Sequence, residues 1–219
     1  MTTSDRAQRS LREALFGYVA FAGLSTASRL FQPLFLLVIL TGLTFPLLWG
    51  RRTHDWPTLG FTRRNLGQGL LWGVGAGLIA SAYVVWRASR NPYPPVSNLG
   101  LQLAAGVPLA LLVVAPFQEF FFRAWLQPRL EAALGRWRGL LLTALSFSLW
   151  HLLAPFEGTA TSSLQVSTLA GILTTLAMGL AFGYIFQRVR NIAAPWLAHA
   201  LMVVATILVG AMTLVQYTP

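Results

Sequence analysis

The chain has 219 residues, of which 55% are hydrophobic and only 10% are charged, and its mean hydropathy is +0.61. This balance excludes an ordinary soluble domain and is typical of a protein that crosses a membrane several times. The chain contains no cysteine, which excludes disulfides, haem thioether links and thiolate metal sites. The length suits one compact helical domain over residues 1–219.

The net charge is +10, and every one of the 16 basic residues is an arginine. The arginines cluster at the ends of apolar stretches and form no solvated basic domain, so nucleic acid is not expected as a partner. We expect them to set the membrane topology and to contact anionic lipid head groups. Residues 1–18 lack a small-residue cleavage site after their apolar part, so they are interpreted as mature sequence. The use of arginine alone suggests a prokaryotic plasma membrane protein.

Apolar stretches alternate with polar connections along the whole chain. The sequence therefore predicts an all-α, polytopic transmembrane bundle of about seven spans. The first stretch is short, so it is either a span or an interfacial helix, and we favour a span. The expected spans are residues 13–28, 33–49, 66–86, 101–127, 139–154, 164–187 and 192–215. The expected connections are residues 50–65, 87–100, 128–138, 156–163 and 188–191. The span 66–86 is rich in glycine, which predicts close approach of a neighbouring helix.

The distribution of arginines favours one orientation. If the connection 50–65 is cytoplasmic, alternation places residues 1–12, 128–138 and 188–191 on the same side. These four segments hold 12 arginines, the segments on the other side hold 3, and Arg123 lies within a span. Because cytoplasmic loops carry an excess of arginine, we expect a cytoplasmic N-terminus and an odd number of spans.

The stretch 115–129 places ionisable side chains in an otherwise apolar and aromatic segment. Glu119 and Arg123 are four residues apart, which stacks them on one helix face, and Gln118 lies one residue before Glu119. Ionisable groups in hydrocarbon are costly, so they usually pair, face the protein interior and mark a functional site. The alternative interpretation is a structural ion pair that fixes the end of a helix.

Two histidines also lie inside expected spans, His151 and His199. Counting helical rise from the span ends places both of them and Glu119 in the inner half of the bilayer. One carboxylate and two imidazoles in an apolar shell can activate water, bind a metal or relay protons. A single buried histidine is more often a helix–helix hydrogen-bonding residue, but three polar side chains at compatible depths favour a shared site.

Three motifs occur in a fixed order within residues 101–204, and together they resemble a known family. The first is Gln-Glu-Phe-Phe-Phe-Arg at residues 118–123. The second is Phe-Ser-Leu-Trp-His at 147–151, and the third is Ala-Pro-Trp-Leu-Ala-His-Ala-Leu-Met-Val at 194–203. The chain resembles the CPBP family, membrane proteases related to the CAAX prenyl endopeptidase and to bacteriocin-immunity (Abi) proteins. The motif-bearing core would cover residues 101–215.

The resemblance implies a helix bundle whose site lies in a cavity open toward the cytoplasm. It implies that a glutamate and the first histidine activate water for peptide-bond hydrolysis, while the second histidine and an asparagine stabilise the oxyanion. This chain departs from the family at two positions. The family's first glutamate is Gln118 here, and an amide cannot take a proton from water. The family's asparagine is Val203, which cannot donate a hydrogen bond.

Two function hypotheses follow from the resemblance. In the first, the protein is an intramembrane endopeptidase in which Glu119 is the base, His151 holds the water, His199 binds the oxyanion and Arg123 orients Glu119. The expected vicinity of the substrate is Gln118, Phe122, Phe147 and Val203. In the second, a catalytically impaired relative binds membrane proteins as a scaffold component. The absence of an inverted repeat argues against a transporter.

The sequence leaves more than one cofactor and more than one class of substrate open. Glu119, His151 and His199 are ligand types that suit zinc, so a metal site is an open alternative to catalysis without metal. No prenyl-binding residue is identifiable, so a prenylated peptide and a membrane protein are both candidate substrates. Lipids are expected partners in either case.

Overall fold

The computed structural model describes residues 2–154 and 169–212, which contain helices and no strand. The helices outside the centre are α1 (Thr3–Leu30), α2 (Leu34–Thr53), α3 (Leu66–Arg90), α7 (Arg136–Leu153), α8 (Leu169–Val189) and α9 (Ala193–Leu208). The central helix runs without a break over Leu99–Leu134. It consists of α4 (Leu99–Leu109), the π-helical segment η1 (Ala110–Val114), α5 (Ala115–Glu119), the π-helical segment η2 (Phe120–Leu126) and α6 (Gln127–Leu134). The prediction of an all-α fold is therefore confirmed over the described residues.

Four helices are long and apolar enough to cross a membrane. They are α2, α3, the central helix and α8, and α9 is a shorter apolar helix. These helices confirm an integral membrane protein by length and composition. The predicted spans 13–28 and 139–154 are helical as well, in α1 and α7, but neither helix is among the four. Both begin with arginine-bearing turns, which lowers their hydropathy.

One predicted connection is wrong. Residues 128–138 were expected to form a loop, but the central helix continues through α6 to Leu134, and only Gly135, with φ of 85°, interrupts the chain before α7. Pro128 is tolerated because it occupies the first turn of α6, directly after the π-helical segment. The predicted connection 156–163, the start of the span 164–187 and the end of the span 192–215 lie outside the described residues.

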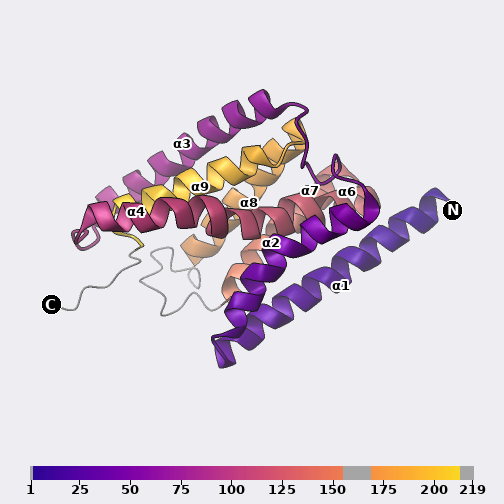
Figure 1. The fold of residues 1–219 in the computed structure, drawn as a ribbon, viewed down its shortest axis with the longest axis horizontal. Coiled ribbons are helices and arrows are strands. Elements are labelled where there is room, and N and C mark those ends of the chain that lie inside the picture. The colour runs from indigo at the N-terminus through magenta and orange to yellow at the C-terminus, as the bar shows by residue number, and fades with distance from the viewer. Residues whose placement is uncertain (1, 155–168, 213–219) are drawn as a thin grey trace.

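The arginine-rich connections gather at one end of the bundle. The Asn191 side chain donates hydrogen bonds to the backbone oxygens of Thr62 and Arg64, at 2.8 and 2.9 Å. The Asn65 side chain donates to the Val189 oxygen at 3.1 Å. These connections lie toward the same side of the bundle as the N-terminus and α6, at the right of Figure 1. The alternation that the arginine count assumed is thus present in the fold.

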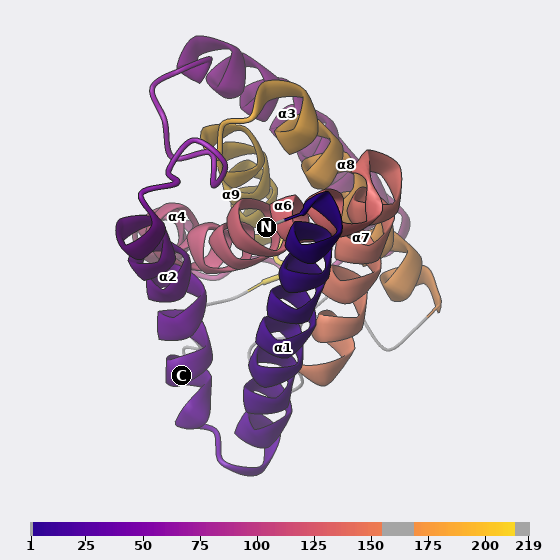
Figure 2. The same cartoon turned by 90° about the vertical axis from the view of Figure 1, so that its right-hand side faces the viewer.

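The central helix is surrounded by the others, as the view along it shows (Figure 2). On one side, α1 and α2 cover an aromatic core that includes Phe21, Phe121 and Trp125. On the other side, α3 packs against α9. The predicted close approach through glycine is found there, because a Cβ on Gly73 would lie 2.8 Å from the Ala194 oxygen. This packing holds the polar residues of the central helix away from lipid.

Candidate active site

Glu119 lies at the junction between α5 and the π-helical segment η2. Glu119 and Arg123 have no solvent exposure, and Gln118 is 3% exposed. A π-helical segment inside an α-helix often marks a functional site, because it redirects side chains that a regular helix would place elsewhere. Here it brings a glutamate and an arginine into the interior of the helix bundle.

The Glu119 carboxylate connects two helices. Its Oε1 atom accepts a hydrogen bond from Arg123 Nη1 at 3.0 Å and lies 2.7 Å from Nδ1 of His199, on α9. Its Oε2 atom is buried with no hydrogen-bond partner among the described residues, as are Arg123 Nε and the Gln118 side-chain oxygen. The first and third motifs, far apart in the sequence, therefore meet at one carboxylate oxygen.

Arg123 is enclosed by aromatic rings and a backbone carbonyl. Its guanidinium carbon lies 4.2 Å from the centre of the Phe147 ring and 5.7 Å from that of the Phe182 ring. Its NH2 group donates to the Gly179 oxygen of α8 at 3.4 Å. These contacts fix the charge that neutralises Glu119.

His151, on α7, lies beside this ion pair. Its Nδ1 atom is 2.8 Å from the Phe147 oxygen, and because a carbonyl only accepts, Nδ1 must carry the proton. The Phe147 ring contacts the His151 ring at 4.4 Å between centroids and the His199 ring at 6.4 Å. His151 also lies within electrostatic range of His199 and Arg123. The structure thus brings together the carboxylate, the arginine and both imidazoles.

The other predicted site residues lie around this group. Phe122 is fully buried, and its ring meets the Phe147 ring edge to face at 5.2 Å, so it supports the site from the core. Val203 lies one turn after His199 on α9 and packs in an apolar cluster with Ala110 and Ile207. The Val203 side chain therefore contributes to core packing.

The side chains do not fit a zinc ion. Among the residues described, no three His, Asp or Glu side chains lie close enough to share a metal. Glu119 Oε1 already contacts two donors.

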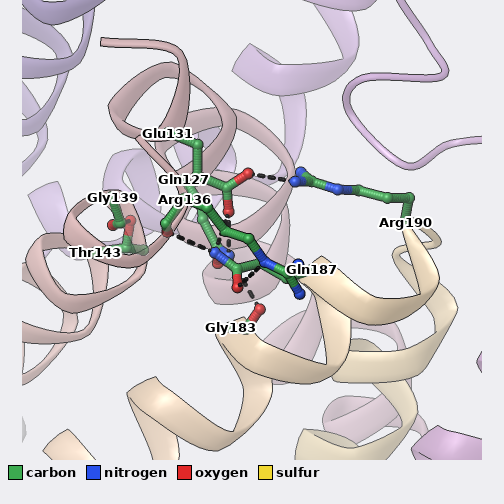
Figure 3. Close-up of polar contacts among 8 residues, drawn as sticks. All are labelled: Gln127, Glu131, Arg136, Gly139, Thr143, Gly183, Gln187 and Arg190. Atoms are coloured by element: carbon green, nitrogen blue, oxygen red, sulfur yellow. Dashed lines mark hydrogen bonds and ion pairs between the residues drawn. The ribbon is translucent and has the colours of Figure 1, made fainter. Parts of the chain in front are cut away.

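A second polar cluster was missed by the sequence analysis (Figure 3). Glu131 lies in the stretch 128–138 that was expected to form a loop, but its side chain is 8% exposed and pairs with Arg190. Its Oε1 atom accepts from the side-chain amides of Gln127 and Gln187, each at 2.8 Å. Gln127 also donates to the Gly183 oxygen at 3.0 Å. The cluster ties α6 to α8 next to the site.

A sequence signal for this cluster exists. Glu119, Arg123, Gln127 and Glu131 follow each other at intervals of four residues. Side chains at this spacing are neighbours on one helix face, so the polar stripe extends from the site to the end of α6. The signal was hidden because residues 128–138 were interpreted as a loop.

A helix bundle with a buried glutamate, an arginine and two histidines from three helices defines an integral membrane protein with a candidate hydrolytic site. Residues 100–205 match the family described as Type II CAAX prenyl endopeptidase Rce1-like. The resemblance drawn from the three motifs is thereby confirmed. The chain has no significant match among curated proteins or solved structures.

Proposed function

We propose that the protein is an intramembrane endopeptidase that hydrolyses peptide bonds at the Glu119 site. The observation that carries the proposal is the 2.7 Å contact between Glu119 Oε1 and His199 Nδ1. It joins two family motifs in the interior, where neither side chain is more than 4% exposed. A buried carboxylate that is hydrogen-bonded to an imidazole can keep the imidazole in the protonation state that activation of water requires.

The second imidazole adds to this chemistry. His151 donates Nδ1–H to the Phe147 carbonyl, so the lone pair of its neutral ring is on Nε2. We propose that this imidazole helps to position the attacking water against the peptide carbonyl. Arg123 orients Glu119 through the hydrogen bond that its Nη1 atom donates. We propose a cytoplasm-facing site, because the arginine-rich connections and Glu131 lie at the same end of the bundle.

The substrate class follows from the family match and the membrane location. The Rce1-like family is described as CAAX prenyl endopeptidases, so prenylated peptides are candidate substrates. Membrane proteins with a segment at the same depth are the other candidates.

The test is a proteolysis assay in detergent micelles with prenylated and unprenylated peptides. The wild-type protein should cleave at least one set, and Glu119→Gln should lose at least ~10²-fold in rate, because the acid–base chemistry of the site depends on this carboxylate. Asp55→Asn, which removes an exposed carboxylate, is the matched control and should keep full activity. Equal cleavage by the wild type and Glu119→Gln would refute the site.

A specific observation favours a second candidate, a non-catalytic relative that binds membrane proteins. Gln118 lacks a proton-accepting carboxylate, and Val203 packs with Ala110 and Ile207 in place of a hydrogen-bond donor. Under this alternative the wild type cleaves nothing, while the double variant Gln118→Glu/Val203→Asn gains proteolysis. Partner binding would then survive replacement of His151 and His199 by phenylalanine.

A further inference from the structure

We infer that His199 Nε2 is the atom that takes the proton from the attacking water, and that Glu119 is a positioning residue acting through His199. This inference rests on the proposed endopeptidase function and assigns its general base. It differs from the sequence-based expectation, in which Glu119 was the base and His199 bound the oxyanion.

The proton positions on His199 follow from its partner. Arg123 contacts the same oxygen of Glu119 as His199 does, at 3.0 and 2.7 Å, so the carboxylate is ionised and acts as acceptor. His199 Nδ1 must therefore donate, and the lone pair of the neutral ring is on Nε2. Nε2 has no hydrogen-bond partner within residues 2–154 and 169–212. An imidazole held in this state by a carboxylate is a competent general base.

Gln118 and Glu119, at the family's two glutamate positions, are poorer candidates for the general base than His199. Gln118 carries an amide, which cannot take a proton. Glu119 is fully buried, and its Oε1 cannot accept a proton without losing a bond to Arg123 or His199. Its Oε2 has no exposed surface through which water enters. His199 retains 4% exposure of its side chain.

The choice between the two histidines depends on what each Nδ1–H contacts. His151 donates to the Phe147 backbone carbonyl, a neutral group. His199 donates to a carboxylate. After proton transfer the ring is a cation, and a carboxylate stabilises that cation far better than a carbonyl does. His199 is therefore the favoured base.

The step balances as a hydrolysis. The water oxygen bonds to the scissile carbonyl carbon while one water proton moves to His199 Nε2, and the carbonyl electron pair moves to its oxygen. When the tetrahedral intermediate collapses, the carbon–nitrogen bond breaks and His199 Nε2 returns the proton to the leaving nitrogen. One water is consumed, and Glu119 stays ionised throughout.

A rescue experiment tests this assignment. His199→Asn keeps an amide donor near the position of Nδ1, so the bond to Glu119 survives while the base is removed. We expect cleavage to fall by ~10²–10⁴-fold. Adding Gln118→Glu restores a carboxylate at the family's base position. The double variant should cleave about tenfold faster than His199→Asn alone, or more. His54→Gln, in a connection, is the control with unchanged activity. Gln118→Glu in the wild-type background is measured beside it, and a larger gain in the His199→Asn background is the readout that a merely structural role for His199 would not give.

A second measurement is independent of turnover. The chain has only three histidines, so ¹⁵N-histidine NMR of the protein in micelles can resolve the signals of each ring. Variants that each lack one histidine assign these signals. We expect His199 to be protonated at Nδ1 and bare at Nε2, and Glu119→Gln to weaken that preference. A proton on Nε2 of resting His199 overturns the inference.

The outcomes separate the two proposals. If the wild-type protein cleaves peptides and Gln118→Glu does not rescue His199→Asn, the assignment of the base is wrong while the endopeptidase function stands. If the wild type cleaves nothing and only Gln118→Glu/Val203→Asn is active, the proposed function fails and the inference fails with it. Cleavage, rescue and an Nδ1-protonated ring together support both.

Discussion

Arg123 and Glu119 form an ion pair from which solvent is entirely excluded, with 3.0 Å between Nη1 and Oε1. The two residues lie on the same helix, and the pair is completed by His199 from α9 and the Gly179 carbonyl from α8. A buried pair of this kind contributes little net stability, but removing one partner strands the other charge. Replacing either residue should therefore affect both the candidate site and the stability of the fold.

Removal of the arginine should destabilise the protein strongly. Arg123→Met leaves the Glu119 charge with His199 as its remaining partner, and breaking a buried pair costs about 3–5 kcal/mol. The double variant Arg123→Met/Glu119→Gln removes the stranded charge and should recover most of the loss. Thermal unfolding in detergent measures both. A double variant no more stable than the single one would show that charge burial is not the cause.

Gly42 should be essential for the position of α2 against the site. A Cβ at this residue would lie 2.4 Å from the backbone oxygen of Phe117, which directly precedes Gln118 and Glu119. Gly42→Ala should cost about 1–3 kcal/mol, as overpacking typically does, and should reduce activity by displacing α5. Gly75→Ala is the matched control, since nothing lies within 4 Å of its Cβ position. Equal melting temperatures for the two variants would contradict the packing.

The hydrogen bonds of the Glu131 cluster should contribute more to the free energy of unfolding than the ion pair of Glu131 with Arg190 does. Glu131→Ala removes the acceptor for Gln127, Gln187 and Arg190, and we expect a loss of about 1–3 kcal/mol from charge-assisted bonds. Arg190→Ala breaks only the ion pair, and because the arginine side chain is 44% exposed, the loss should be about 1 kcal/mol or less. Urea or thermal unfolding compares the two. A larger effect for Arg190→Ala would mean that the amides contribute nothing.

The absence of cysteine permits a direct test of membrane orientation. Ser4 and Ser97 are both exposed, and the arginine count places Ser4 in the cytoplasm and Ser97 outside. In intact cells, a membrane-impermeant maleimide should label Ser97→Cys and spare Ser4→Cys until the membrane is opened. The reverse pattern would invert the proposed topology and place the site at the other face.

The sequence alone determined the class of the protein and its family. Hydropathy and arginine bias are properties of contiguous segments, so the long apolar helices could be predicted without contacts, and so could the gathering of the arginine-rich connections at one end. The three motifs carry residue identities in a fixed order, which is why the family resemblance could be recognised and is confirmed over residues 100–205.

Only the tertiary structure decided which polar groups are partners. The contact of His199 with Glu119, and of His151 with a backbone carbonyl, depends on the rotation and depth of three separate helices. Neither quantity is encoded in a local pattern. Likewise Glu131 is buried only because α6 continues beyond Pro128 and meets α8. Hydrogen bonds between helices depend on the exact packing of the side chains, whereas a sequence pattern gives only the approximate position of each helix along its axis.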